Sequence, residues 1–221
     1  MTPEQTAQVS ATLLSSGKAF TFLFMTLGPL KVIGPFVRMT RGRDAGFKRA
    51  LALQGIVIAI LATLVGGLVG SMVLERWGVS LGALLLAAGT VLFLVALRPL
   101  LDQFQPDTHA APASDGPPPS ASALAFSPLA FPTIVTPHGI AILVLLVTLN
   151  AGDVPGTVKV YELLGVVLVL DLLAMLFADR IVKTPGVAPV LGILGSVIGI
   201  LQVALGIQAI LTALRVLGIT S

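Results

Sequence analysis

Three side chains inside long apolar stretches could do chemistry: Asp171, Lys31 and His138. Asp171 lies nine residues after Glu162 and eight before Asp179, which places it near the middle of an apolar stretch. A carboxylate at mid-membrane costs about 2.5–3.5 kcal/mol on insertion scales, so it should be protonated, paired or facing water. The pattern predicts a proton or cation site at Asp171. The alternative is an acid satisfied by neighbouring polar groups, with no role in transport.

Lys31 and His138 each stand beside residues that interrupt helices. Lys31 lies between Gly28-Pro29 and Gly34-Pro35, where it could hold an anion, or where its stem could instead carry the ammonium group to the membrane interface. His138 follows Pro137, and an imidazole that titrates near neutral pH could relay a proton or donate to a solute. The alternative for His138 is a residue that only begins a helix.

The composition indicates that membrane-spanning helices position these groups. Of 221 residues, 56% are hydrophobic and 10% charged, against about 45–50% apolar and 25% charged in a typical soluble domain. The formal net charge of +3 provides no basic face for several phosphates, which argues against nucleic-acid binding. With no cysteine and only two histidines, we expect no disulfide, no metal and no cofactor.

Six stretches are long and apolar enough to cross a bilayer, which takes about 20 residues. They are residues 19–37, 50–74, 78–97, 124–149, 161–177 and a part of 184–214. The last stretch is too long for one untilted crossing and too short for two, so we predict one tilted helix with an ordered lead-in. The amino terminus lacks the small-residue cleavage site of a signal peptide and is expected to lead into the first span.

The chain is predicted to consist of two helical repeats joined by a linker. Residues 1–104 form the first three-helix repeat, residues 105–122 a disordered linker rich in Pro, Ala, Ser and Asp, and residues 123–221 the second repeat. Beside the spans, four Lys and Arg residues lie on the amino-terminal side and eight on the opposite side. The positive-inside rule then predicts periplasmic termini and a cytoplasmic linker.

The interrupted spans are the first and the fourth, and each of them opens a group of three. Residues 28–35 read Gly-Pro-Leu-Lys-Val-Ile-Gly-Pro, and residues 127–139 contain Pro128, Pro132 and Pro137. Because each half has an odd number of crossings, a duplicated half must insert upside down, as in many transporters that bind solutes between discontinuous helices. We therefore predict an all-α integral membrane protein with six transmembrane helices in two inverted three-helix repeats, helices 1 and 4 being broken by Pro and Gly. Kinks without a ligand are the alternative.

Glycines at intervals of seven residues predict close helix packing in the third and sixth spans. These are Gly82 and Gly89 in the third span, and Gly192, Gly199 and Gly206 in the sixth. Seven residues make about two helical turns, so each set lies on one face of its helix, where another helix can approach closely.

Several of these segments resemble MarC-like bacterial inner-membrane proteins. The resemblance lies in the first span with Pro29 and Pro35, in the Ser-Pro-Leu-Ala-Phe-Pro run at residues 127–132 with Pro-His-Gly at 137–139, and in residues 87–93 and 202–207. It implies a six-span, multi-pass protein of the bacterial inner (plasma) membrane, related to the LysE-type exporter superfamily and of unsettled substrate. Gly28 stands where the family usually has Asn, and Thr136 and His138 stand where it usually has two glycines.

Together these features predict a secondary transporter or exporter of a small solute. In the concrete hypothesis, half-helices that restart after the breaks attract the carboxylate of a zwitterionic, amino-acid-like solute, Lys31 reinforces its binding, and Asp171 receives an amine or a proton. One half then rocks against the other. The substrate-binding residues expected are Pro29, Lys31, Gly34, Pro35, Pro132, Thr136, Pro137, His138 and Gly139, with Asp171 as the proton or cation site.

Two other classes of protein compete with a transporter. An intramembrane enzyme is not expected, and no catalytic residue is predicted, because the chain has no Gly-x-Ser-x-Gly elbow and Asp171 has no second intramembrane acid. A membrane scaffold or subunit-packing protein stays the alternative, because glycine stripes and proline kinks need no ligand. The expected partners are the lipid bilayer and an unidentified small solute, with a homo-oligomer left open and nucleic acid not expected.

Overall fold

The computed structural model describes residues 16–102 and 120–219, and these ranges are helical with no strand. In chain order the helices are α2 (Ser16–Leu27), α3 (Leu30–Met39), α4 (Ala45–Trp77), α5 (Leu81–Asp102), α6 (Ala121–Leu124), η1 (Ala125–Ile134), α7 (Pro137–Leu149), α8 (Val154–Lys183) and α9 (Val187–Val216). The predicted all-α class is confirmed. Of the predicted linker, residues 105–119 lie outside the described ranges, and Ser120 caps α6 by accepting a hydrogen bond from the Ala123 N–H at 3.3 Å.

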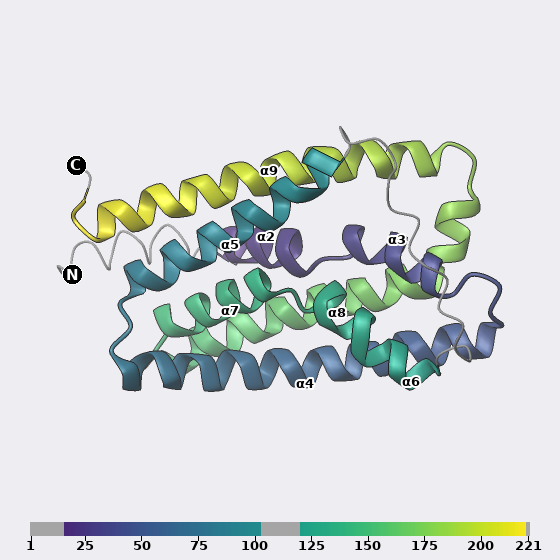
Figure 1. The fold of residues 1–221 in the computed structure, drawn as a ribbon. Coiled ribbons are helices and arrows are strands. Elements are labelled where there is room, and N and C mark those ends of the chain that lie inside the picture. The colour runs from purple at the N-terminus through teal and green to yellow at the C-terminus, as the bar shows by residue number, and fades with distance from the viewer. Residues whose placement is uncertain (1–15, 103–119, 220–221) are drawn as a thin grey trace.

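Five segments are long and apolar enough to cross a membrane. They are Ser16–Met39, Ala45–Trp77, Leu81–Arg98, Val154–Lys183 and Pro189–Val216. A sixth crossing is made if Ala121–Ile134 and Pro137–Leu149, which meet at an angle of 62°, form one span. The crossings lie side by side as an elongated bundle (Figure 1). The chain is therefore a multi-pass integral membrane protein.

Defined helix ends allow neighbouring crossings to run antiparallel. The Asp44 carboxylate accepts hydrogen bonds from the N–H groups of Gly46 at 3.0 Å and Phe47 at 3.2 Å, and so caps α4. At the other end of α4, Gly78 has a φ of 63°, a left-handed conformation that ends a helix without a Cβ clash. α5 then returns along the bundle (Figure 1).

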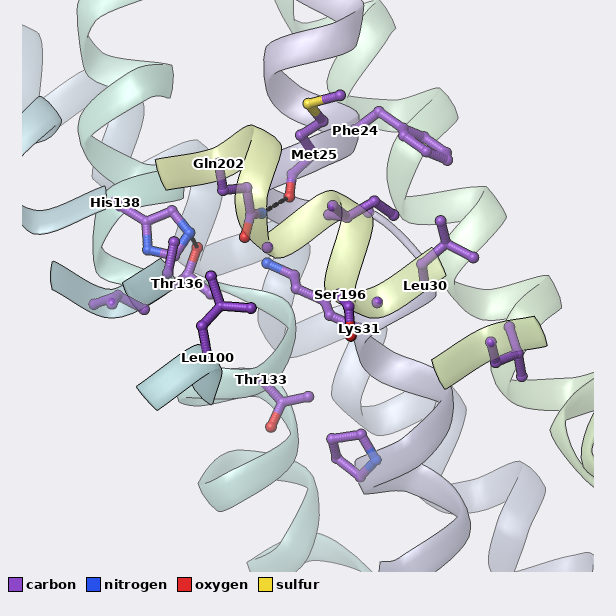
Figure 2. A pocket seen from close by; sticks show the side chains of 18 of the residues that line it. Phe24, Met25, Leu30, Lys31, Leu100, Thr133, Thr136, His138, Ser196 and Gln202 are labelled. Atoms are coloured by element: carbon purple, nitrogen blue, oxygen red, sulfur yellow. Dashed lines mark hydrogen bonds between the residues drawn. The ribbon is translucent and has the colours of Figure 1, made fainter. Parts of the chain in front are cut away.

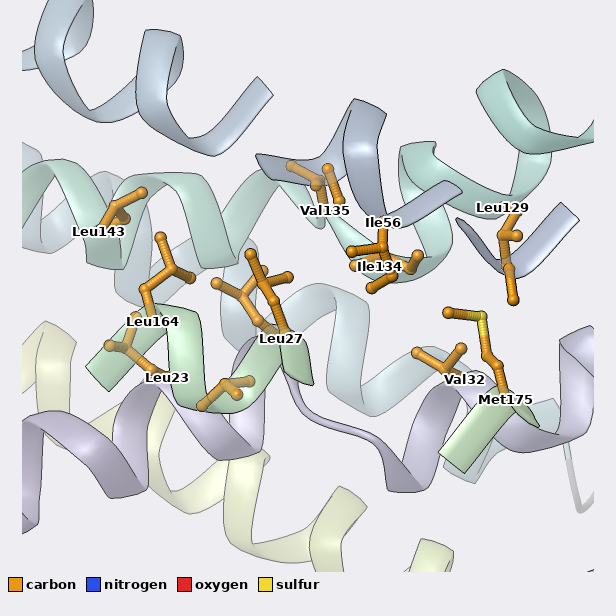
Figure 3. Packing of buried hydrophobic residues seen from close by; sticks show 14 of the residues in the cluster. Leu23, Leu27, Val32, Ile56, Leu129, Ile134, Val135, Leu143, Leu164 and Met175 are labelled. Atoms are coloured by element: carbon orange, nitrogen blue, oxygen red, sulfur yellow. The ribbon is translucent and has the colours of Figure 1, made fainter. Parts of the chain in front are cut away.

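The buried core lies where α2, α3, α4, η1, α7 and α8 meet. Leu27, Ile134, Leu164 and Met175 contribute fully or almost fully buried side chains from α2, η1 and α8 (Figure 3). Glycines let α4 approach the second half of the chain, because a Cβ at Gly55 would stand 2.7 Å from the Leu129 side chain. The core thus holds together the helices that carry the two interrupted crossings.

α5 and α9 form a second close contact, along one side of the bundle (Figure 1). A Cβ at Gly89 would stand 2.9 Å from the Gly206 carbonyl oxygen, and one at Gly206 would stand 2.8 Å from the α5 backbone. The predicted glycine packing is confirmed for Gly82, Gly89, Gly199 and Gly206. It is wrong for Gly192, where a Cβ would meet nothing within 4 Å, because this part of α9 faces a cavity.

Candidate functional site

The first crossing is interrupted at Gly28 and Pro29, between α2 and α3. Pro29 has no N–H, so the carbonyl oxygen of Met25, four residues earlier, loses its helical hydrogen bond. The Gln202 side chain of α9 donates to this oxygen instead (Figure 2). Glycine is required at position 28, because a Cβ there would overlap the Phe24 carbonyl. A side chain from the last helix therefore replaces the bond that the proline removes.

The next carbonyl oxygen, that of Thr26, accepts hydrogen bonds from two side chains. Lys31 donates to it from the first turn of α3. Thr136 donates to it at 3.0 Å from the second half of the chain. In a continuous helix this oxygen would accept the N–H of the residue four positions on. The end of α2 and the start of α7 are therefore joined directly at Thr26.

The fourth crossing leaves helical geometry at Ser127 and Phe131 within η1, and again at Val135 and Thr136. The backbones of Val135 and Thr136 are extended, with φ/ψ of −91°/96° and −87°/149°. The Thr136 hydroxyl caps α7 by accepting a hydrogen bond from the Gly139 N–H at 3.1 Å. Pro137 occupies the first position of α7. An N–H at this position has no acceptor within the helix, so the proline costs no helical hydrogen bond. Gly139 is held against α2, since a Cβ there would overlap the Leu27 side chain.

His138 contacts the same hydroxyl at 3.3 Å through Nε2 (Figure 2). A hydroxyl has one hydrogen to donate, and that of Thr136 is directed at the Thr26 carbonyl. Nε2 of His138 is therefore the donor in this contact. Its Nδ1 is buried and has no hydrogen-bond partner among the described residues, so the imidazole has an acceptor nitrogen to spare.

A cavity of about 690 Å³ lies against both interruptions, within the range of about 300–1,000 Å³ typical of small-molecule sites. Residues from α2, α3, α5, η1, α9 and the start of α7 surround it (Figure 2). Its lining comprises Phe24, Met25, Gly28, Leu30, Lys31, Pro35, Arg38, Val95, Ala96, Leu100, Pro132, Thr133, Thr136, His138, Leu191, Gly192, Gly195, Ser196, Ile198, Gly199 and Gln202.

The cavity brings together some of the substrate-binding residues predicted from sequence. Those that line it are Lys31, Pro35, Pro132, Thr136 and His138. The predicted residues outside its lining are Pro29, Gly34, Pro137 and Gly139. Two of these shape the wall nonetheless: Pro29 frees the carbonyl that Gln202 binds, and Gly139 lets α7 approach α2.

Asp171, on α8, is fully buried and lies outside the cavity lining. Neither of its carboxyl oxygens has a hydrogen-bond partner within the described part of the chain. No ion pair joins Lys31 to Asp171 within residues 16–102 and 120–219, although the two groups are close enough to interact electrostatically. Asp171 is therefore a buried acid with no hydrogen-bond or ion-pair partner in the described part of the chain.

Comparison with known proteins places the chain in a family. A family model described as MarC family integral membrane protein matches residues 14–217. The chain belongs to the MarC family. It is 25% identical over 204 residues to a UPF0056 membrane protein of Methanocaldococcus jannaschii, covering 89% of this chain and 94% of the relative. It is 25% identical over 170 residues to a UPF0056 membrane protein of Archaeoglobus fulgidus, covering 76% and 78%. No solved structure matches the chain.

Sequence patterns alone do not indicate two of the polar residues that line the cavity of this MarC-family chain. In the sequence, Arg38 belongs to the basic loop after the first span. It serves there only to predict the orientation of the chain in the membrane. Gln202 is one of three glutamines in apolar stretches, a pattern typical of helix-to-helix hydrogen bonds. The one available signal is the position of Gln202 in a 31-residue stretch without charge.

Proposed function

We propose that this MarC-family protein is a secondary transporter that carries a small solute across the membrane. The observation that carries the proposal is the cavity, because it lies against two interrupted crossings. It is lined by the ammonium group of Lys31, the imidazole of His138 and several hydroxyl groups. Discontinuous helices around a shared chamber are typical of transporter binding sites. A membrane scaffold, the competing class, would need no such chamber.

The transport step that we propose is a rocking of residues 1–104 against residues 123–221, as two inverted three-helix repeats. In Figure 1, α2–α3, α4 and α5 run along the bundle in the opposite sense to α6–α7, α8 and α9 respectively. Polar contacts between the described parts of the two halves include those of Thr136 with the Thr26 carbonyl and of Gln202 with the Met25 carbonyl, and an ion pair at one end of the bundle. A movement of one half against the other would have to break these contacts in turn, some of them in each state of the transport cycle.

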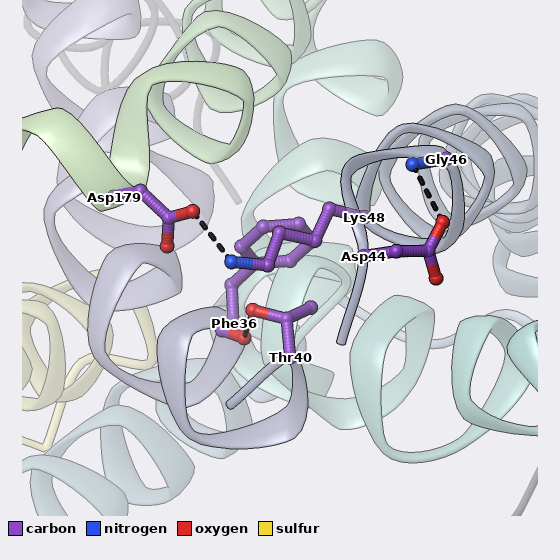
Figure 4. A network of polar contacts seen from close by, with 6 residues as sticks. All are labelled: Phe36, Thr40, Asp44, Gly46, Lys48 and Asp179. Atoms are coloured by element: carbon purple, nitrogen blue, oxygen red, sulfur yellow. Dashed lines mark hydrogen bonds and ion pairs between the residues drawn. The ribbon is translucent and has the colours of Figure 1, made fainter. Parts of the chain in front are cut away.

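The ion pair joins α4 to α8 (Figure 4). Lys48 Nζ lies 2.5 Å from Asp179 Oδ2, with the two side chains 23% and 43% exposed. Phe36 and Thr40 of the first crossing lie beside the Lys48 stem (Figure 4). Because the pair is reached by water, its strength is modest, which suits a contact that opens and closes during a transport cycle.

The direction of the chain in the membrane follows from its basic residues. The ends of α3 and α8 and the start of α4 lie at one end of the bundle (Figure 1), and the basic residues of the loop after α3 and those closing α8 gather there. By the positive-inside rule this end is cytoplasmic and both termini are periplasmic. In this proposal the protein resides in the inner (plasma) membrane and is related to LysE-type exporters, as the sequence resemblance implies, and such a relation would favour outward movement of the solute.

The solute that we propose is small and carries a carboxylate, a class that includes both zwitterionic, amino-acid-like molecules and simple carboxylates. Lys31 supplies the cation for the carboxylate. Asp171 lies outside the cavity lining, so we assign it a proton rather than the amine of the solute. A carboxylate that binds Lys31 changes the field at Asp171, and this coupling would link solute movement to uptake or release of a proton.

Asp171→Asn tests this proposal in reconstituted vesicles, with Asp153→Asn as the matched control, because Asp153 lies exposed before the same helix. Vesicles are loaded with a mixture of amino acids and small carboxylic acids. The retained solutes are identified by mass spectrometry at about pH 6 and about pH 8, on either side of neutrality. Wild type and Asp153→Asn should release a solute to an extent that depends on pH, and Asp171→Asn should not. Retention by wild-type vesicles equal to that of protein-free vesicles would favour the scaffold.

The remaining expectations extend the same proposal. We propose that the protein is not an enzyme and works without a cofactor. Its partners are the lipid bilayer and the solute, with self-association left as an open alternative and no nucleic acid among them. These statements follow from the composition, and from the Thr136 hydroxyl, which donates its hydrogen to the Thr26 carbonyl rather than to the neighbouring imidazole of His138.

A further inference from the structure

We infer that the cavity selects a monocarboxylate that has an apolar body and no amine. This inference deepens the proposed function and rests on it for transport, whereas binding can be tested separately. Among the carboxylate-bearing solutes considered above, the net charge of the cavity lining favours those without an ammonium group.

The charged side chains of the lining are all basic. Lys31 and Arg38 reach the cavity from α3, seven residues apart and hence on one face of the helix. No Asp or Glu is among the described residues that line it. A carboxylate would therefore find two cations, whereas an α-ammonium group would face these cations without an acid to balance it.

The buried acid does not change this sign. Asp171 lies outside the cavity lining, and a single carboxylate can offset at most one of the two positive charges. Arg38 forms no ion pair within residues 16–102 and 120–219, and Asp179, at the same end of the bundle, pairs with Lys48. Arg38 thus leaves the cavity with a net positive charge even if Asp171 is ionised.

The remaining wall is mostly apolar. Phe24, Leu30, Val95, Leu100, Leu191 and Ile198 surround the cavity from α2, α3, α5 and α9. α9 presents glycines rather than side chains at positions 192 and 195, where an added Cβ would meet nothing within 4 Å, so the space beside this helix stays open. Apolar walls with a few placed polar groups suit a ligand with a hydrocarbon body.

The two cations are also arranged along the path that a solute would take. Arg38 is exposed near the end of α3, and Leu100 and Leu191 lie near the end of α5 and the start of α9. Lys31 lies deeper, beside the interruption. Seven residues of helix separate the two cations by about 10 Å along the axis. A carboxylate would first meet Arg38 at the basic end of the bundle and then Lys31.

Isothermal titration calorimetry on the purified full-length protein tests the selection with three ligands of one shape: 4-methylpentanoate, leucine and 4-methylpentanamide. Opposite charges in a partly wet cavity should give 4-methylpentanoate at least about tenfold tighter binding than either other ligand. Arg38→Gln should remove most of that preference. Arg41→Gln is the matched control, because Arg41 is exposed two residues beyond α3 and does not line the cavity.

Equal or tighter binding of leucine, binding of none of the three, or equal effects of the two arginine substitutions would overturn the inference. Flux in vesicles separates it from the proposed function. Selective binding of 4-methylpentanoate without transport of any solute would sustain the inference and contradict the transporter. Transport of leucine by a protein that does not bind 4-methylpentanoate would sustain the transporter and contradict the inference.

Discussion

Replacement of Gly206 by alanine is expected to force α9 away from α5. The added Cβ would stand 2.8 Å from the backbone nitrogen of Phe93, 2.9 Å from its Cα and 3.0 Å from the Gly89 carbonyl oxygen. Ordinary contacts begin near 3.4 Å, so the helices would have to separate by about 0.6 Å at this point. Backbone atoms of a helix cannot rotate aside as the end of a side chain can, and the close packing must therefore open along the pair.

The expected loss of stability is about 1–2 kcal/mol. Overpacking of a well-packed contact costs about 1–3 kcal/mol, and an alanine in a helix recovers about 0.5–1 kcal/mol relative to glycine. Gly195→Ala is the matched control on the same helix, because a Cβ there would meet nothing within 4 Å. This control should be as stable as wild type or more stable by up to about 1 kcal/mol.

Unfolding of the purified proteins in mixed micelles with increasing SDS, followed by circular dichroism, measures both changes. Thermal aggregation in detergent, followed by size-exclusion chromatography, provides a second readout. Gly206→Ala should unfold earlier than wild type and Gly195→Ala should not. If the two variants unfold together, α5 and α9 do not pack through this glycine contact, and the wall of the cavity that they form is wrongly placed.

Substitutions at three further polar contacts are measured by the same SDS titration. Gln202→Leu should cost about 0.5–1.5 kcal/mol because the carbonyl at the proline break loses its donor, whereas Gln208→Leu on the exposed side of α9 should change little; equal effects would contradict this contact. Thr136→Val should lower the free energy of unfolding by about 1–2 kcal/mol, because the cap of α7 and the hydrogen bond to α2 are lost together. Thr136→Ser keeps the hydroxyl and should retain most of the stability. Equal losses in the two variants would indicate that Thr136 acts only through its shape. A double-mutant cycle of Lys48→Met and Asp179→Asn should give a coupling below about 1 kcal/mol for this part-exposed pair, and a coupling above about 2 kcal/mol would be inconsistent with its exposure.

The location of the crossings could be predicted from hydropathy, because a segment in hydrocarbon must be apolar and must satisfy its backbone internally. Each of the six predicted stretches overlaps a helix or helix pair of the structure. The helices are longer than the predictions at α4 and α8, which are 33 and 30 residues long. Their ends carry charged residues that lie beyond the apolar stretch, and a hydropathy pattern cannot follow a helix there.

Part of the candidate site could be predicted as well. Prolines and glycines mark Lys31, Thr136 and His138 because backbone chemistry makes these residue types interrupt helices. That Arg38 lines the cavity and that Asp171 lies outside its lining could not be predicted, because the position of a residue in the sequence does not tell which way its side chain faces. The structure places Arg38 in the cavity lining and buries Asp171 outside it.

The amino-acid sequence by itself determined that this chain is an all-helical membrane protein and where its apolar segments lie, since both follow from local composition and from the length of helix that a bilayer requires. Only the tertiary structure decided which groups meet: Gln202 with the Met25 carbonyl, and Thr136 with the Thr26 carbonyl. These partners are more than 100 residues apart, and their meeting depends on how each helix is rotated and packed. A periodic pattern, such as the glycines of α5 and α9, marks the face on which a helix packs, but it does not name the segment that packs there.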